Sequence, residues 1–355
     1  MGNNDFKIVN GDILIELKKM DDQSVDMIFA DPPYNMQTDG ILKRTDGSDF
    51  KGVDDEWDKF ESLEEYKEFS TKWLKECKRI LKDHGTMWVI GSFQNIYLLG
   101  NIIQDLDFWI LNDIIWEKSN PVPNFSGARF CNAHETLIWF KKNNGSKFTF
   151  NYHTMKTFNN GKQDRSVWQI PICIGAERLV GEDGKKLHNT QKPLELLEKV
   201  VLSSTKKGDV ILDPFSGTGT TGAAALKYGR KYIGIEREVL YCNASIDRLN
   251  NQQQSKDLVL INNILDIKPP RVPITDLLEK NYINVGDILC DKNGENKAAI
   301  DKEGLLQVGN EKLSIHKASA KILNKQNHNG WDFWYLERNK KSIDDIRKKY
   351  REKEL

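Results

Sequence analysis

The chain has 355 residues, which corresponds to about two domains of ordinary size. Hydrophobic residues make up 39% of it and aromatic residues 10%, a composition that excludes a wholly disordered protein. The 52 basic side chains balance 52 acidic ones, so the overall charge gives no sign of a nucleic-acid partner. No apolar run approaches the ~20 residues that span a bilayer, and no basic segment leads into an apolar one at the N-terminus. We therefore expect neither a membrane segment nor a secretion signal.

Short apolar runs alternate with amphipathic stretches over the first third of the chain, which predicts strands alternating with helices. The predicted strands cover residues 6–9, 25–30 and 86–91, and the predicted helices cover residues 13–20, 63–81 and 96–105. The stretch 37–60 is polar, acidic and glycine-containing, which predicts a long loop of the kind that forms lids or stays disordered.

The same alternation continues after residue 105. Strands are predicted at residues 108–116, 136–140, 209–212 and 231–235, and helices at residues 194–203, 220–228 and 240–253. A stretch rich in Pro, Asn and Gly, 120–132, separates the first two of these strands, and the polar segment 143–186 predicts an insertion. Strands that alternate with helices predict an α/β fold with a mainly parallel sheet covered on both faces.

The last quarter of the chain has a different character. Residues 251–257 are polar and residues 269–273 are proline-rich, which predicts a linker before a separate module. This module reads as short strands and turns as far as residue 340. From residue 312 to 353 there are 12 basic and 5 acidic side chains, a net charge of +7. Such a stretch is compatible with phosphate contact or with a solvated helix face and a frayed tail.

The five cysteines are dispersed, at positions 77, 131, 173, 242 and 290, and none belongs to a CxxC pair. This usage is typical of a reducing cytoplasm, where cysteine acts as a small buried hydrophobe. The pair His134-Glu135 resembles the start of HExxH, but position 138 is Ile138, so the second histidine ligand is missing. We therefore expect no metal site.

The segment DPFSGTGTT (213–221) follows a predicted strand and opens a predicted helix. Small residues there let the backbone approach a ligand, and a new helix offers unpaired N–H groups. About twenty residues on, Glu236 ends the next strand, where an acid can hold a ribose diol. The segment is not a P-loop, because no lysine follows the glycines, and it lacks the full GxGxxG pattern. The turn and the acid are compatible with an adenosyl cofactor.

A second motif, DPPY (31–34), follows the strand predicted at 25–30, at the edge where open α/β sheets bind ligands. A strand stopped by prolines and followed by a simple turn is one interpretation. The other is chemical: the N6 lone pair of adenine is delocalised, and two fixed acceptors can localise it. The Asp31 carboxylate and the Pro32 carbonyl can each accept one N–H, while Tyr34 stacks on a base that has left the duplex.

The two motifs together resemble DNA amino-methyltransferases that use S-adenosylmethionine, and their order resembles the β class. Four longer segments, 31–37, 53–58, 120–135 and 188–193, resemble one branch of that class. This is the GANTC-specific branch of adenine-N6 methyltransferases, of the HinfI and cell-cycle-regulated (CcrM) type. The resemblance covers nearly the whole chain. It implies a Rossmann-like, mostly parallel methyltransferase sheet with permuted motif order, followed by a small mainly-β or mixed domain.

The resemblance also implies a reaction: methyl transfer from S-adenosylmethionine to adenine N6, in 5'-GANTC-3', by base flipping and direct attack. It implies a catalytic domain over 1–255 with a recognition region at about 120–187, a linker over 256–273 and a DNA-binding accessory domain over 274–355. An RNA or protein amino-methyltransferase with the same core is the alternative enzyme. A DNA-binding protein without catalysis is the alternative of another class.

Roles follow from the resemblance by position. The catalytic residues are Asp31, Pro32, Pro33 and Tyr34. The cofactor-binding residues are Asp12, Thr190, Gln191, Lys192, Asp213, Phe215, Gly217, Thr218, Gly219, Thr220 and Glu236. Among these, Lys192 is expected to neutralise the cofactor carboxylate. Asp12 is expected to bind the adenine amine of the cofactor or to act as a helix N-cap, and both interpretations stay open.

The expected DNA contacts are Trp57, Asn120, Pro123, Asn124, Arg129, Asn132, His134, Lys317, Lys321 and Lys325. Asn and Arg can read adenine and guanine in the major groove, although part of this set is expected only to stabilise its loop. Trp57 either wedges into the duplex or anchors its loop in the core. The expected partners are double-stranded DNA, a second copy of the chain and a cognate restriction endonuclease. The expected location of the protein is the cytoplasm of a prokaryotic cell, where either the cell or a phage encodes it.

Overall fold

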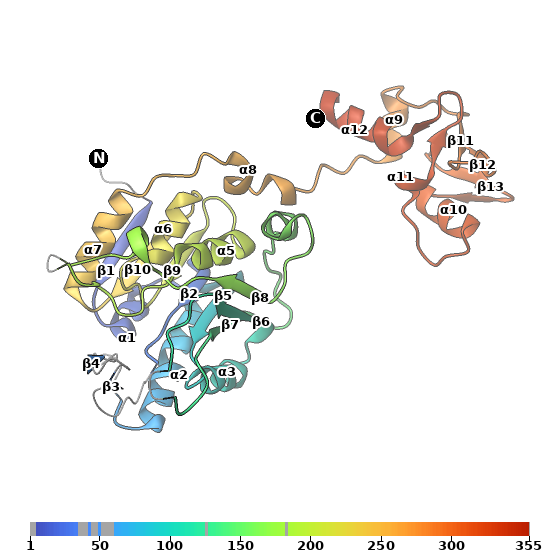
Figure 1. Cartoon of the computed structure of the whole chain (residues 1–355). Helices are drawn as coiled ribbons and strands as arrows, with labels where there is room; N and C mark the ends of the chain where they lie inside the picture. Colours follow the sequence, from blue (N-terminus) through green and yellow to red (C-terminus); the bar gives the residue numbers. More distant parts are fainter. Residues whose placement is uncertain are drawn as a thin grey trace. The chain divides into compact units, whose positions relative to one another are not determined.

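The computed structural model describes residues 5–34, 42–43, 49–50, 60–124, 127–181 and 184–354. It divides into two compact units, residues 1–267 and residues 268–355, which are described separately (Figure 1). The expected contact at Trp57 lies outside the described residues, as does most of the loop expected at 37–60.

The first unit is built on an eight-stranded sheet with the strand order β1-β10-β9-β2-β5-β7-β6-β8. All neighbouring strands are parallel except that β7 runs antiparallel to both β5 and β6. The strands, in this spatial order, are Phe6–Asn10, Lys231–Glu236, Val210–Asp213, Val25–Ala30, Leu81–Gly91, His134–Lys141, Trp109–Lys118 and Val167–Ile170. The mostly parallel sheet expected from the sequence is confirmed.

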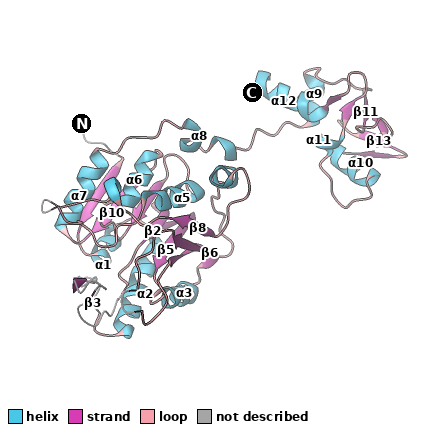
Figure 2. Ribbon diagram, in the orientation of Figure 1, coloured by secondary structure: helices cyan, strands magenta, loops and turns pink. Residues whose placement is uncertain are grey.

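Helices cover both faces of this sheet, with α1, α2 and α3 on one side and α5, α6 and α7 on the other (Figures 1 and 2). These helices are Ile13–Glu16, Leu63–Ile80, Ile96–Asp105, Leu194–Ser204, Thr220–Lys227 and Val239–Asn250. Successive residues of β2 belong to opposite layers: Ile28 packs in the first apolar core, and Met27 and Phe29 pack in the second. A strand that is buried on both faces reads as a continuous apolar run, which is why β2 is apparent in the sequence.

Local capping explains where helix α2 begins. The Ser62 hydroxyl accepts a hydrogen bond from the Glu65 amide (3.1 Å), and the Glu65 carboxylate accepts one from the Glu61 amide (2.7 Å). Acidic residues occupy the first turn and basic residues the last, as the helix dipole favours. The helix buries Trp73 and Leu74 against the sheet.

Two segments contain more regular structure than expected. The stretch 143–186 holds helix α4 (Tyr152–Lys156) and strand β8, which extends the sheet beyond β6. The stretch expected as a linker contains α8 (Leu258–Ile261) and a 3₁₀ turn at Ile264–Asp266. The buried Arg230 guanidinium donates to the Ile261 carbonyl (2.8 Å) and the Asn263 amide oxygen (2.8 Å), which holds this stretch on the first unit. The boundary between the units therefore lies after residue 267.

The second unit is a small mixed fold around Leu289 and Trp334. Strands β11, β12, β15 and β16 form one antiparallel sheet, and β13 and β14 form a separate hairpin. Their bounds are Ile288–Cys290, Lys297–Ala299, Tyr335–Leu336, Lys341–Ser342, Leu306–Val308 and Glu311–Leu313. The helices are α9 (Ile274–Glu279), α10 (Ile315–Ile322), α11 (Gly330–Phe333) and α12 (Ile343–Glu354), of which the first three replace expected strands and turns.

A short antiparallel pair, β3 (Leu42–Lys43) and β4 (Asp49–Phe50), completes the strands of the described residues. In the same part of the chain, no helix combines the length and apolar character that crossing a membrane requires.

Candidate active site

A cavity of about 340 Å³ lies at the carboxyl ends of the parallel strands, the edge at which open α/β sheets bind ligands. Nearly all the residues predicted for catalysis and cofactor binding line it. They are Asp12, Asp31, Pro32, Pro33, Tyr34, Thr190, Gln191, Lys192, Asp213, Phe215, Gly217, Thr218, Thr220 and Glu236. The lining thus joins segments that are up to about two hundred residues apart in the sequence.

The glycine-rich turn between β9 and α6 needs its glycines for conformation and for space. Gly217 and Gly219 have φ angles of +50° and +76°, in the left-handed region that favours glycine. A Cβ atom on Gly219 would lie 2.3 Å from the Ser245 hydroxyl oxygen, and one on Gly217 would lie 3.4 Å from His188 Nε2. Gly217 thus brings backbone to the cavity wall beside His188, and Gly219 lets the turn pack closely against Ser245 of α7.

Two carboxylates shape this part of the wall. Glu236 accepts hydrogen bonds from the Gly217 and Glu238 amides, both 2.8 Å long, and so joins the end of β10 to the glycine turn. Asp213 accepts from the Phe215 amide (3.0 Å) and from the Thr221 hydroxyl (2.6 Å). Burial raises the pKa of Asp213 to about 7, and these hydrogen bonds oppose the rise. Asp213 thus holds the turn together from inside the fold.

Two further predicted cofactor residues, Asp12 and Gln191, form hydrogen bonds within the protein. Asp12 caps α1, because its carboxylate accepts from the Leu14 (2.9 Å) and Ile15 (3.3 Å) amides, and it also lines the cavity. The Gln191 side chain is engaged with a neighbouring loop: it accepts from the Leu179 amide (3.0 Å) and donates to the Glu177 carbonyl (2.9 Å). These bonds give Gln191 a structural role.

Asp31 directly follows β2 at the other side of the cavity. Its Oδ2 atom receives a hydrogen bond and ion pair from Lys192 Nζ at 2.6 Å. Its Oδ1 atom is buried and has no hydrogen-bond partner among the described residues. The Pro32 carbonyl likewise accepts no hydrogen bond within the described part of the chain. Because buried polar atoms are almost always paired, a pair of acceptors in this state points to a donor that the protein itself does not supply.

The turn that carries these acceptors is held from behind. The buried Tyr66 hydroxyl donates to the Pro33 carbonyl at 2.7 Å, and the Asn95 amide donates both to that carbonyl (3.4 Å) and to the Tyr66 oxygen (3.1 Å). With two prolines restricting the backbone as well, the positions of Asp31 and Tyr34 are fixed before any ligand binds.

Tyr34 is buried, and its hydroxyl donates to Glu135 Oε2 at 2.8 Å. Glu135 also forms an ion pair with Lys118 (2.8 Å) and lies 3.8 Å from Lys192 Nζ. Burial alone would raise the pKa of Glu135, but the two ammonium groups hold it below its ordinary value. Burial and the carboxylates of Asp31 and Glu135 keep the pKa of Tyr34 well above its ordinary value, so the phenol stays protonated and donates.

Lys192 therefore lies against the catalytic candidate Asp31 in this structure. Burial lowers the pKa of Lys192, but attraction to Asp31 and Glu135 outweighs it, so the net shift is upward and the ammonium persists. Burial raises the pKa of Asp31, and the Lys192 ammonium offsets part of the rise. The contacts around Asp31, Pro33 and Tyr34 also involve four residues that were not predicted as site residues: Glu135, Lys118, Tyr66 and Asn95.

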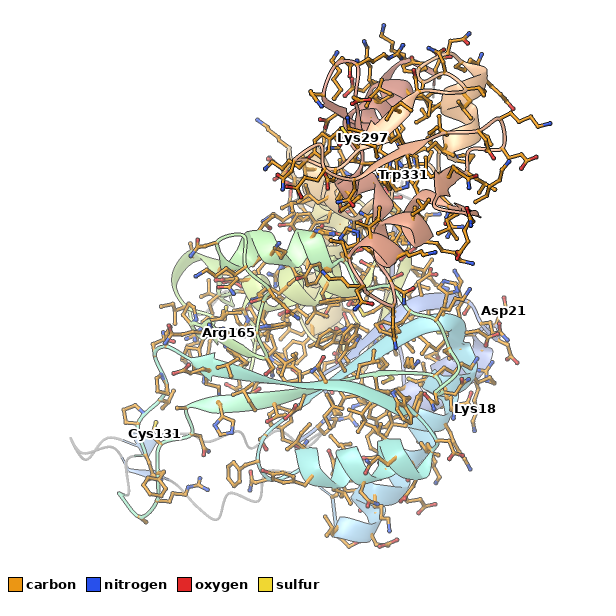
Figure 3. All side chains as sticks on the ribbon, turned by 90° about the vertical axis from the view of Figure 1, so that its right-hand side faces the viewer. Lys18, Asp21, Cys131, Arg165, Lys297 and Trp331 are labelled. Carbon is orange, nitrogen blue, oxygen red and sulfur yellow. The ribbon has the colours of Figure 1, made fainter. Side chains whose placement is uncertain are left out.

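The predicted DNA contacts of the first unit lie in the loop between β6 and β7. Pro123, Arg129, Asn132 and His134 are exposed, and Arg129 lies over the Phe93 ring at 5.3 Å. The exposed Cys131 belongs to the same loop (Figure 3). Two members have local roles: the Asn120 side chain accepts from the Ile172 amide (2.8 Å), and the Asn124 carbonyl accepts from the Gly127 amide (3.2 Å).

The predicted contacts of the second unit are exposed as well. Lys317 and Lys321 lie on α10 and Lys325 follows it, and Lys321 forms an ion pair with Glu311 (2.7 Å). Trp331 is buried beneath the Arg347 guanidinium, 4.1 Å from its ring centroid (Figure 3). Trp334 is fully buried, so both tryptophans belong to the core of the second unit.

The fold and cavity define a doubly wound α/β enzyme that binds a nucleoside-type cofactor beside a carboxylate with a free oxygen. No cluster of metal-ligating side chains occurs among the described residues. The family model described as DNA methylase matches residues 25–247, and the one described as Restriction Enzyme Adenine Methylase Associated matches residues 263–355. The chain belongs to the DNA methylase family.

Individual relatives support this assignment. The type II methyltransferase M.HinfI of Haemophilus influenzae is 55% identical over 352 residues, which cover 98% of each chain. The type II methyltransferase M2.DpnII of Streptococcus pneumoniae is 42% identical over 254 residues, which cover 71% of this chain and 92% of the relative.

Solved structures show the same fold. The complex of M1.HpyAVI with SAM is similar with a TM-score of 0.51 and 26% identity, over 69% of this chain and 99% of that one. The cytosine-N4-specific PvuII DNA methyltransferase gives a TM-score of 0.54 at 22% identity, over 74% of this chain and 94% of that one.

Proposed function

We propose that this protein transfers a methyl group from S-adenosylmethionine to N6 of adenine within 5'-GANTC-3' in double-stranded DNA. The observation that carries the proposal is the buried Oδ1 atom of Asp31 next to the Pro32 carbonyl, two acceptors without a hydrogen-bond donor within the described residues. Family membership and the 55% identity with M.HinfI over nearly the whole chain support the choice of DNA and of the GANTC branch.

The residues around the glycine turn fit the cofactor. Gly217 lines the cavity without a side chain and so leaves room for a ligand against the backbone, and the Glu236 carboxylate reaches the same wall, where it can accept from ribose hydroxyls. Asp12, Thr190, Phe215, Thr218 and Thr220 complete this lining. S-adenosylmethionine, when bound, supplies an electrophilic methyl group.

The chain's own residues then act on the amine. An exocyclic amine is a poor nucleophile while its lone pair is delocalised into the ring. Asp31 Oδ1 and the Pro32 carbonyl each accept one N–H, which favours a pyramidal nitrogen with its lone pair directed away from both acceptors. Tyr34 offers an aromatic face to a flipped base, and its hydroxyl bond to Glu135 fixes the ring. Asp31 can take up the proton that the amine releases.

Sequence recognition is assigned to the loop between β6 and β7. Arg129 and Asn132 are exposed and have the chemistry to pair with guanine and adenine in the major groove, and His134 and Pro123 border them. The Arg129 guanidinium is held by the Phe93 ring before DNA binds. Trp57 and the lysines of α10 remain proposed contacts to the duplex and its phosphates.

The alternative acceptors are RNA, protein and cytosine N4. The match of residues 263–355 to a family described as associated with restriction-enzyme adenine methylases favours DNA adenine. We also infer a homodimer, a cognate restriction endonuclease and a cytoplasmic location. Sedimentation with and without a GANTC duplex tests the dimer. A particle of about twice 40.9 kDa is expected, and a 40.9 kDa particle under both conditions contradicts it.

The variant Asp31→Asn tests the catalytic assignment. It should lower kcat on a GANTC duplex by on the order of 100-fold or more, because the amide loses the negative charge. Asp83→Asn is the matched control, since that carboxylate is exposed at the opposite edge of the sheet and pairs with Lys142 (3.2 Å). Wild-type turnover in Asp31→Asn would show that another group activates the amine.

A further inference from the structure

Four side chains from three separate segments form a closed cluster behind the proposed acceptor. Asp31 follows β2, Tyr34 lies three residues on, Lys192 precedes α5, and Glu135 lies on β7. Lys192 contacts Asp31 at 2.6 Å and lies 3.8 Å from Glu135, and Glu135 accepts from Tyr34 at 2.8 Å. The Lys192 ammonium also lies over the Tyr34 ring, 5.1 Å from its centroid.

Glu135 contacts both Tyr34 and Lys192 but makes no hydrogen bond to Asp31 Oδ1. Its Oε2 atom receives the Tyr34 hydroxyl and faces Lys192, while its Oε1 atom pairs with Lys118 of β6. The side chain is only 12% exposed, and Lys192 is 7% exposed. A buried carboxylate is costly unless it is paired, and here partners at both oxygens stabilise Glu135 and fix its position.

We propose that Glu135 is a positioning residue for methyl transfer. It fixes the Tyr34 ring against the base and shares the Lys192 ammonium, so that Lys192 occupies only Oδ2 of Asp31 and leaves Oδ1 for the substrate amine. The inference rests on the proposed function, because it concerns the same reaction. It adds a residue 101 positions from Tyr34 that does not touch the base.

The charges facing Asp31 give this role a measurable signature. Lys192 lowers the pKa of Asp31, and Glu135 raises it. The carboxylate of Asp213 on β9 also interacts with Asp31. The Lys118 ammonium on β6 balances the negative charge of Glu135, and the Tyr34 hydroxyl stays neutral. Neutralising Glu135 removes one negative charge near Asp31, so the pKa of Asp31 falls. The acid limb of the activity profile, where Asp31 takes up its proton, then moves to lower pH.

The test compares Glu135→Gln, Tyr34→Phe and the double variant on a GANTC duplex, with Asp83→Asn as the control. Glu135→Gln should lower kcat on the order of 10- to 100-fold, the scale of a small misplacement of reacting groups, while KM for the cofactor and the Kd for DNA stay within about twofold. Its acid limb should move to lower pH. The losses of the two single variants should not add, because both perturb the same hydrogen bond: Tyr34→Phe removes its donor, and Glu135→Gln replaces its charged acceptor with a neutral one.

The outcomes separate the inference from the proposed function. A Glu135→Gln protein with unchanged kcat, or with an acid limb at the wild-type pH, overturns the positioning role even when the wild type methylates GANTC. Additive losses overturn the link through Tyr34. If Glu135→Gln fails to fold, Tyr34→Phe still decides: it leaves Glu135 charged and removes a hydroxyl that lowers the pKa of Asp31, so the acid limb should move to higher pH, opposite to Glu135→Gln, while kcat falls. An unchanged kcat overturns the inference. Absence of wild-type methylation overturns the proposed function instead.

Discussion

Replacing Lys192 with methionine removes the cation that faces Asp31 at 2.6 Å and keeps most of the side-chain volume. At an effective dielectric constant of about 20, two unit charges at this distance attract each other by roughly 6 kcal/mol. Breaking a buried ion pair typically costs about 3–5 kcal/mol, because the remaining charge has no partner. Glu135, 3.8 Å away, loses part of its compensation as well. We expect a folded but destabilised variant.

The direction of the pH effect follows from the charges. Burial raises the pKa of Asp31, and Lys192 offsets part of that rise, so Lys192→Met raises the pKa further. The acid limb of methylation should therefore move to higher pH than in the wild type. The pH dependence of the folding stability follows from the same shift in the pKa of Asp31. A carboxyl whose pKa is raised by folding favours the folded state below its unfolded pKa and loses this contribution as the pH rises. The difference in Tm between Lys192→Met and the wild type should thus become smaller as the pH is lowered.

The assay is the pH profile of kcat/KM for methylation of a duplex with one GANTC site, with Tm measured in parallel. Lys199→Met is the matched control, because Lys199 lies on α5, is similarly buried and pairs with Asp164 at 2.8 Å. It should lose stability without a shift of the acid limb. An unshifted limb in Lys192→Met, together with a raised KM for S-adenosylmethionine, would assign Lys192 to the cofactor carboxylate and refute this reasoning.

Two further predictions concern the cofactor wall. Gly219→Ala introduces a Cβ atom 2.3 Å from the Ser245 oxygen and should weaken cofactor binding by about tenfold or more in calorimetry. Gly161→Ala has a similar φ of +77° but open space around it, so it should cost stability alone; equal cofactor affinity in both variants would contradict the steric argument. Burial, followed by the charge of Lys192, lowers the pKa of His188 from 6.5 to about 4, so its contribution to stability is present above pH 6.5 and is lost as the pH falls toward 4. His188→Asn should flatten that part of the Tm profile, and an unchanged profile would exclude His188 as its source.

The cavity lining could be predicted because the carboxyl ends of neighbouring parallel strands meet at one edge. Asp31 follows β2 and Asp213 ends β9, and these strands are adjacent in the sheet. Strand β2 is apolar from Met27 to Ala30 and β9 is apolar from Val210 to Leu212, so Asp31 and Asp213 are visible in the sequence as the polar residues that follow these apolar runs. The glycine turn is equally visible, because its positive φ angles require glycine.

Glu135 could not be predicted in the same way. It lies on the antiparallel strand β7, which enters the sheet between β5 and β6, and the sequence pattern does not specify that order. Its neighbour His134 was interpreted as a DNA contact, and nothing in the local pattern distinguishes the two. Gln191 and Asn120 were assigned to ligands for a related reason: their partners are backbone groups of distant loops, at Leu179 and Ile172. The short helices α9 and α11 are below the length at which apolar periodicity is informative.

The most direct measurement treats unmodified random-sequence DNA with the purified protein and S-adenosylmethionine and maps the modified bases by single-molecule sequencing. The account predicts N6-methyladenine confined to the adenine of GANTC, with no signal for Asp31→Asn. Methylation at another motif would keep the mechanism and overturn the assigned site, and N4-methylcytosine would overturn the assigned base. Absence of DNA methylation by a protein that binds the cofactor would contradict the central claim.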